Sequence, residues 1–255
     1  MSVFKQFYKS VYSPRDISSY RFQGIGKTIL FIFLLSLLSM LPTGYFITSD
    51  LTNGISYLED IFQEDLPEFK IENGKLISSS TEPFTIRNDD FTFILDSTGT
   101  ITSRDVESYL YTIALLQDEL IIYSNANLQT FDYTMVEDMV ITDNDIRSFF
   151  NTFQSALPIL IPMILLMLYI MVSGLKFIEV TLIGLIGLLL KNIVGVNLRF
   201  RHTWIIAAYS VTISTVFFTI MEAVRAQVPY AAFLNWAVSV FVLYLAFKEI
   251  PKRKK

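Results

Sequence analysis

Lys176 and Glu179 are the residues whose types and spacing most strongly suggest chemistry. They are three positions apart, so they share one face of a helix and can form an ion pair. Apolar runs flank them on both sides, and ionisable side chains inside membrane segments are costly and often functional. We therefore single out this pair as the candidate functional pair. The alternative is that both side chains lie at the membrane interface, where a charge costs little.

Residues 96–100, Asp-Ser-Thr-Gly-Thr, are similar to the phosphorylation motif of P-type ATPases, in which lysine occupies the position of Ser97. Phosphoryl transfer needs Mg²⁺ and several charged groups, and the chain is too short for such a pump. We expect a strand ending in a turn at residues 96–100.

Residues 24–28 end like a phosphate-binding loop, but Arg21 occupies the position of its first glycine. Here we expect a flexible joint with Lys27 at the lipid headgroups.

Other catalytic and metal chemistry has few residues to use. The sequence contains no Cys and one His, which excludes disulfides and thiolate sites and leaves little for a histidine site. Asp89-Asp90 and Asp143-Asn144-Asp145 are too short for an EF-hand loop, so we expect solvated surface there. We predict no catalytic, cofactor-binding or metal-binding residues, and no enzymatic activity.

The composition is that of a membrane protein. The chain is 52% hydrophobic and 17% charged, whereas soluble domains are about 45–50% apolar and about a quarter charged. Residues 28–48 contain no charge, and about 20 apolar helical residues cross a hydrocarbon core of about 30 Å. We predict a retained transmembrane anchor at 28–48, with a cleaved signal peptide as the alternative.

Residues 1–27 carry five Lys or Arg and one acidic residue. Phe4, Phe7 and Tyr8 recur at three- and four-residue spacing and would share one helix face. This pattern predicts a cytoplasmic amphipathic segment lying in the membrane interface, with Phe4, Phe7, Tyr8 and Lys27 as its anchors. An ordinary packing helix is the alternative.

Residues 49–152 differ sharply from their surroundings. They contain 20 Asp or Glu against 5 Lys or Arg, a net charge of −15, and no long apolar run. Asn73-Gly74 predicts a hairpin turn. Residues 91–95 predict a strand, and residues 119–123 and 128–133 predict a second hairpin around 125–127.

Helices should open and close this acidic region. An apolar stripe runs from Ile55 to Phe62, and Asp143 is a plausible N-cap for a helix that continues into the next membrane span. Pro158 and Pro162 should then lie in the first turns of that span, where proline is tolerated. We predict an acidic extracytoplasmic α+β domain at 49–152, inserted between membrane spans.

Residues 153–248 predict a C-terminal transmembrane α-helical bundle. Its apolar segments are 155–175, 203–221 and 229–247, whereas 177–190 would be only about 21 Å long as a helix. We predict four spans in total, with 177–190 as a short interfacial or re-entrant helix. Five spans are the alternative.

Basic residues concentrate in segment 1–27, loop 191–201 and tail 249–255. The positive-inside rule makes all three cytoplasmic in the four-span arrangement, in a multi-pass plasma-membrane protein. The five-span arrangement would place the tail outside. Both arrangements put the acidic domain outside the cell.

Several stretches together carry a resemblance: 4–10, 12–14, 21–29, 71–76, 93–96 and 248–252. The chain resembles a family of membrane proteins from Gram-positive bacteria that is catalogued only as a domain of unknown function, some of whose members are labelled maltodextrin-utilisation proteins. This resemblance implies a bacterial plasma-membrane location and supplies no catalytic residues. A weaker similarity of residues 155–247 to five-span Rab-interacting proteins favours five spans.

Two functional hypotheses remain. The first is a non-enzymatic accessory, sensor or scaffold protein, whose outer domain binds an extracellular ligand or partner and whose bundle binds another membrane protein. The second is a transporter component or permease for small molecules such as oligosaccharides, which would require polar side chains such as Lys176, Glu179 and Asn235 to face the bundle interior. Both place the chain in the lipid bilayer, and neither involves nucleic acid.

Overall fold

The computed structural model describes residues 2–63, 66–87, 91–109, 111–124 and 127–251. Asp89-Asp90, the loop residues 125–126 and tail residues 252–255 lie outside these ranges, as does the side chain of Phe62. The chain forms two compact units. Met1–Ser49 and Ile159–Lys255 make up the helical unit, and Asp50–Pro158 make up the sheet unit.

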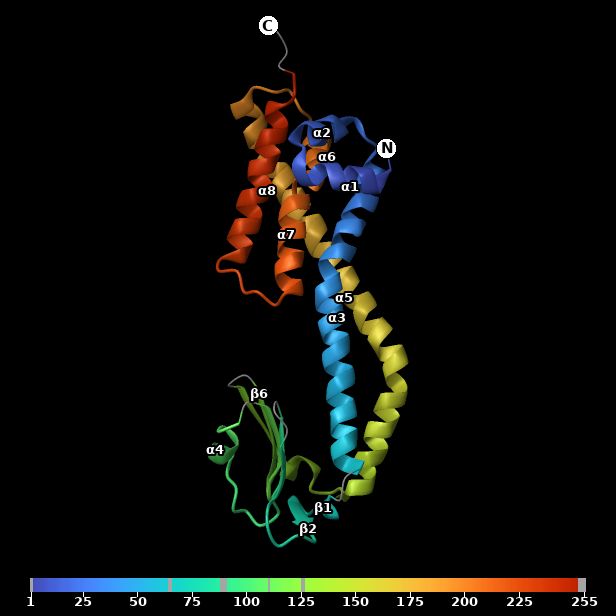
Figure 1. Cartoon of the computed structure of the whole chain (residues 1–255), viewed down its shortest axis with the longest axis vertical. Helices are drawn as coiled ribbons and strands as arrows, with labels where there is room; N and C mark the ends of the chain where they lie inside the picture. The colour runs from blue at the N-terminus through green and yellow to red at the C-terminus, as the bar shows by residue number, and fades with distance from the viewer. Residues whose placement is uncertain (1, 64–65, 88–90, 110, 125–126, 252–255) are drawn as a thin grey trace. The chain divides into compact units, whose positions relative to one another are not determined.

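Helices dominate the first and last parts of the chain (Figure 1). Four helical stretches of the described residues are long and apolar enough to cross a membrane: Ile25–Glu59, Asp143–Val194, Phe200–Ala223 and Ala231–Lys248. The helices are α1 (Val3–Tyr12), α2 (Pro14–Ser19), α3 (Ile25–Gln63), α5 (Asp143–Val194), α6 (Phe200–Ser210), α7 (Thr212–Ala223) and α8 (Ala231–Lys248), with a 3₁₀ turn at Tyr20–Phe22.

Two of these helices are longer than the sequence pattern indicated. The anchor 28–48 and the stripe at 55–62 belong to one helix, α3, of 39 residues. Helix α5 has 52 residues, so segment 177–190 continues the span before it, and the prediction of a separate interfacial or re-entrant helix is wrong. Pro158 and Pro162 lie inside α5, which begins at Asp143 as one helix with the following apolar segment.

The predicted span 203–221 is interrupted at Val211, between α6 and α7. Hydroxyl side chains flank the break and donate to nearby backbone carbonyls, Ser210 to Ile206 and Thr212 to Tyr209. Such back-bonding competes with the helical ladder and bends helices. The break therefore has a local cause in the sequence.

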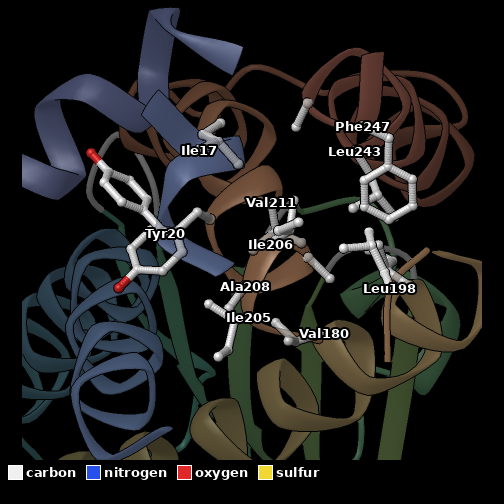
Figure 2. Close-up of a cluster of buried hydrophobic side chains, with 14 of the residues drawn as sticks. Ile17, Tyr20, Val180, Leu198, Ile205, Ile206, Ala208, Val211, Leu243 and Phe247 are labelled. Atoms are coloured by element: carbon white, nitrogen blue, oxygen red, sulfur yellow. The ribbon is translucent and has the colours of Figure 1, made fainter. Parts of the chain in front are cut away.

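One apolar core holds the helical unit together. Figure 2 shows side chains converging from different elements, including Ile17 of α2, Ile206 of α6 and Phe247 of α8. All three have no exposed surface. Helices α1 and α2, the beginning of α3 and the end of α8 lie at the same end of this unit (Figure 1), and α2 contacts both α6 and α8.

The sheet unit contains two sheets, with strand orders β2-β1-β8 and β3-β4-β5-β6-β7. Neighbouring strands are antiparallel except β4 and β5, which are parallel and connected through the short helix α4 (Ser103–Val106). The strands are β1 (Phe69–Glu72), β2 (Lys75–Ser78), β3 (Phe84–Arg87), β4 (Thr92–Leu95), β5 (Tyr111–Leu115), β6 (Glu119–Ser124), β7 (Asn127–Asp132) and β8 (Ile141–Thr142).

The strand and hairpin predictions are confirmed. Asn73 and Gly74 join β1 to β2 with φ values of 52° and 72°, and positive φ at both central residues is the requirement of a type I′ turn. Strand β4 ends at Asp96, and β6 pairs antiparallel with β7.

Successive side chains along a strand point to opposite faces of the sheet, and both faces of the five-stranded sheet are apolar. Phe93, Leu95 and Leu115 pack in one cluster with residues of β1 and β2, whereas Ile94 and Ala114 pack in another cluster on the opposite face, with Val106 of α4. The sheet is therefore covered on both sides.

Helix α5 begins with a different cap from the one that the sequence indicated. Asp145 Oδ2 accepts hydrogen bonds from Thr142 N at 2.9 Å and Thr142 Oγ1 at 2.7 Å, and Asp145 N donates back to Thr142 Oγ1 at 3.2 Å. This reciprocal pattern is a capping box. Thr142, rather than Asp143, therefore caps the helix.

Candidate functional site

Lys176 and Glu179 form an ion pair on α5, with Lys176 Nζ 2.8 Å from Glu179 Oε2. Their side chains are only 11% and 12% exposed. Paired charges in such surroundings are stable only when their remaining hydrogen-bonding capacity is also met. The functional role of the pair stays a prediction.

Side chains of two further helices form hydrogen bonds with this ion pair. Asn235 Nδ2 of α8 donates to Glu179 Oε1 at 2.7 Å, and Lys176 Nζ donates to Thr215 Oγ1 of α7 at 3.2 Å. Both carboxylate oxygens of Glu179 therefore accept a hydrogen bond. We call these four residues the polar network. The sequence flagged three of them, whereas Thr215 resembles any other hydroxyl on an apolar helix and gave no signal.

A cavity of about 240 Å³ adjoins the polar network. Lys176, Thr215 and Asn235 line it, and Glu222 near the end of α7 lies on the same wall. A carboxylate oxygen of Glu222 accepts a hydrogen bond from Thr43 Oγ1 of α3. The complete lining is Ser39, Lys176, Thr215, Phe218, Thr219, Glu222, Ala231, Ala232 and Asn235. Such a polar cavity is large enough to hold water or a small polar group.

Between the polar network and the end of the bundle that holds α1 and α2, the interior is apolar and tightly packed (Figure 2). Ile183, Ile206 and Leu243 have no exposed surface. A Cβ atom at Gly187 would lie 3.2 Å from Thr203 Cβ and 3.3 Å from atoms of Leu243 and Phe247. Helices α5, α6 and α8 are therefore in close contact on this side of the network.

The N-terminal helix α1 has two distinct faces. Gln6 and Ser10 are buried, and Phe7 packs partly buried against the apolar core. Phe4 and Tyr8 are exposed on the other side. The structure thus separates Phe7 from the other predicted anchors, whose contact with lipid stays a prediction, as does that of Lys27 in the first turn of α3.

A ring of hydrogen bonds fixes α1 to the bundle. Gln6 donates to Gln23, Gln23 donates to the hydroxyl of Tyr209, and that hydroxyl lies 3.4 Å from Gln6 Oε1. Tyr209 belongs to α6 and is fully buried. This contact between residues more than 180 positions apart had no sequence signal.

Asp96 has the turn role that its motif favours. Its carboxylate accepts hydrogen bonds from Thr98 N at 2.8 Å, Thr98 Oγ1 at 2.6 Å, Ile101 N at 2.7 Å and Thr100 Oγ1 at 3.3 Å. Burial disfavours the ionised form of Asp96, but these hydrogen bonds outweigh it and lower the pKa of the carboxyl. Both oxygens are thus engaged in holding the loop.

The sheet unit has a larger cavity of about 630 Å³, which we call the aromatic cleft. Its lining is Asp50, Asn53, Gly54, Tyr57, Phe91, Tyr111, Thr112, Ile113, Ile122, Tyr123 and Ser124. Tyr57 and Phe91 meet edge to face, with ring centroids 5.1 Å apart. Within the described ranges, no group of three or more His, Cys, Asp or Glu side chains could hold a metal ion.

Comparisons with known proteins give a family and no activity. A family model described as "Protein of unknown function (DUF1189)" matches residues 4–247, nearly the whole chain. No curated protein and no solved structure matches. The resemblance to a domain of unknown function is therefore confirmed.

Proposed function

We propose that this chain, which belongs to the DUF1189 family of proteins of unknown function, is a non-enzymatic accessory or sensor protein of the plasma membrane. In this proposal the helical unit spans the bilayer four times and binds another membrane protein. The sheet unit lies outside the cell and binds a ligand or partner.

The distribution of charge supports this orientation. Lys27, Lys191, Arg199 and Lys248 fall at the ends of helices that gather at one end of the helical unit (Figure 1). Glu222 lies near the other end, at the end of α7. Cytoplasmic loops are enriched in Lys and Arg, so the basic end is the cytoplasmic one.

The observation that carries the proposal is the length of the exposed apolar surface on α5. Only 6% of the most apolar window of this helix is buried inside the chain. Exposed apolar side chains extend from Ile193 to Ile159, about 51 Å at 1.5 Å per residue. A hydrocarbon core is about 30 Å thick, and covering the whole surface by tilt alone would need about 54°, beyond the usual range of about 0–40°.

Contacts with neighbouring helices support the outer end of this surface as the part that lipid would leave uncovered. A Cβ atom at Gly44 of α3 would lie 3.1 Å from Leu165 Cδ2, so Leu165 is level with Gly44. The adjacent residue Thr43 bonds Glu222, near the end of α7. Residues of α5 before Leu165 therefore lie beyond the outer end of α7.

The uncovered part and the adjoining turns of α5 together have the spacing of a helix-docking seam. Ile159, Met163, Leu166 and Ile170 are 74%, 58%, 60% and 64% exposed, and we call them the outer stripe. Their spacing of four, three and four residues is that of the a and d positions of a coiled coil. An apolar helix of a partner protein would cover Ile159 and Met163, which lie beyond the outer end of α7, and would continue onto Leu166 and Ile170.

Site-specific crosslinking in intact membranes tests this proposal. A photo-crosslinking amino acid at Met163 should yield a protein adduct of defined mass. The same amino acid at Leu189, a residue of comparable exposure near the basic end of α5, should yield none. Absence of any protein adduct at Met163 and Ile159 would refute partner binding by the outer stripe.

Cysteine labelling tests the orientation separately, since the chain has no native Cys. With a membrane-impermeant maleimide on intact cells, Ser97→Cys should react and Asn197→Cys should react only after lysis. Reaction of Asn197→Cys in intact cells would contradict the four-span arrangement.

A transporter component is the second candidate, because Lys176, Glu179 and Asn235 do meet inside the bundle. The packed core beyond the polar network weighs against passage through a single chain. Uptake by liposomes that contain only this protein would favour the transporter over the accessory protein.

A further inference from the structure

We infer that the aromatic cleft of the sheet unit binds an alkylammonium group. This inference rests on the proposed ligand-binding role of the sheet unit and names the chemistry of its ligand. The cleft volume of about 630 Å³ lies within the usual range of about 300–1,000 Å³ for small-molecule sites.

The lining of the cleft has the chemistry of a cation site. Four of its described residues are aromatic, namely Tyr57, Phe91, Tyr111 and Tyr123. Aromatic rings carry negative charge density on their faces, and cages of such rings recognise quaternary ammonium groups. The sheet unit already has one such contact elsewhere, with the Arg87 guanidinium 5.4 Å from the centre of the Tyr109 ring.

Charge around the cleft points the same way. The described lining includes Asp50 and neither Lys nor Arg. Residues 49–152 have a net charge of −15, from 20 acidic and 5 basic residues. A field of one sign concentrates ligands of the opposite sign in a cleft. The cleft therefore favours a cation over an anion or a neutral molecule of the same shape.

Two sources could supply this group: a small molecule with a choline-like headgroup, or a lysine side chain of a basic peptide. Both present an ammonium centre with attached methylene or methyl groups. Choline and oligolysine are suitable probes for the two sources.

Titration calorimetry on the full-length protein, in a neutral detergent without choline groups, tests the inference. Choline should bind at least tenfold more tightly than its neutral tert-butyl isostere, and added salt should weaken the binding. Tyr111→Leu and Asp50→Asn should each weaken choline binding at least threefold. Phe131→Leu should leave it unchanged, because Phe131 is a similarly exposed aromatic residue of β7 outside the cleft lining.

Tighter binding of choline would identify a small-molecule source, and tighter binding of oligolysine would identify a peptide source. Equal binding of choline and the isostere, or binding of neither probe, would overturn the inference. Retention of choline binding in both cleft variants would also overturn it. Crosslinking at Met163 is independent of all these results, so failure here and failure of the proposed function are distinguishable.

Discussion

Replacing Glu179 with Gln should destabilise the bundle, because it leaves the Lys176 ammonium without its counter-ion. In the wild-type protein Lys176 Nζ has two hydrogen-bond acceptors, Glu179 Oε2 and Thr215 Oγ1. Breaking a buried ion pair by removing one partner costs about 3–5 kcal/mol. We expect the lower end, about 3 kcal/mol, because Thr215 remains and the adjoining cavity can admit water.

Unfolding can be followed by tryptophan fluorescence, since Trp204 and Trp236 are the two Trp residues of the chain and both pack against the bundle core. Glu249→Gln is the matched control: it makes the same change at an exposed position after α8, and should alter the free energy of unfolding by less than about 0.5 kcal/mol.

A double variant distinguishes the cost of leaving Lys176 unpaired from the cost of changing the side chain at Glu179. Lys176→Met combined with Glu179→Gln removes both charges while Gln can still accept from Asn235. This variant should recover at least half of the stability lost in Glu179→Gln, because no unpaired charge remains. If Glu179→Gln unfolds like the Glu249→Gln control, the ion pair contributes nothing and this reasoning is refuted.

Three further predictions concern other parts of the chain. Asp96→Asn should lower the stability of the sheet unit by about 1.5–3 kcal/mol near neutral pH, as measured by circular dichroism of the full chain. Because folding lowers the pKa of Asp96, this carboxylate stabilises the folded state at pH values above its unfolded pKa, and the stabilisation is lost as the pH falls through its folded pKa. A difference in stability between the wild-type protein and Asp96→Asn that persists in strong acid would contradict this assignment. Gly187→Ala should destabilise the contact between α5, α6 and α8 by about 1–3 kcal/mol, whereas Gly174→Ala, with no atom within 4 Å of its added Cβ, should be neutral or slightly stabilising in the same thermal melt. Gln6→Ala should loosen α1 by removing its contacts with Gln23 and Tyr209. Limited proteolysis should therefore cleave within α1 faster than in a control with a change on the exposed face, such as Lys5→Ala.

Predictions that depend on neighbouring residues agree with the structure. The Asn73-Gly74 hairpin and the turn after Asp96 follow from the backbone preferences of a few adjacent residues. The four apolar segments were visible for the same reason, because twenty uncharged residues in a row need no tertiary context to be recognised.

Helix length and helix contacts could not be read in this way. A break was expected at Lys176, but α5 continues through it. Lys176 can lie within the helix because its ammonium group is paired with the Glu179 carboxylate and donates a hydrogen bond to Thr215. That compensation comes partly from another helix and is invisible to local pattern.

The sequence by itself determined the segregation of charge, the apolar segments, the strands and their tight turns, because each depends on composition or on residues close together in the chain. Only the tertiary structure decided that Asn235 and Thr215 meet the ion pair of α5, and that Gln6 and Gln23 meet Tyr209. Those contacts depend on the rotation and register of packed helices. Both are set by the shapes of many side chains at once, such as the close approach at Gly187, and no local segment specifies them.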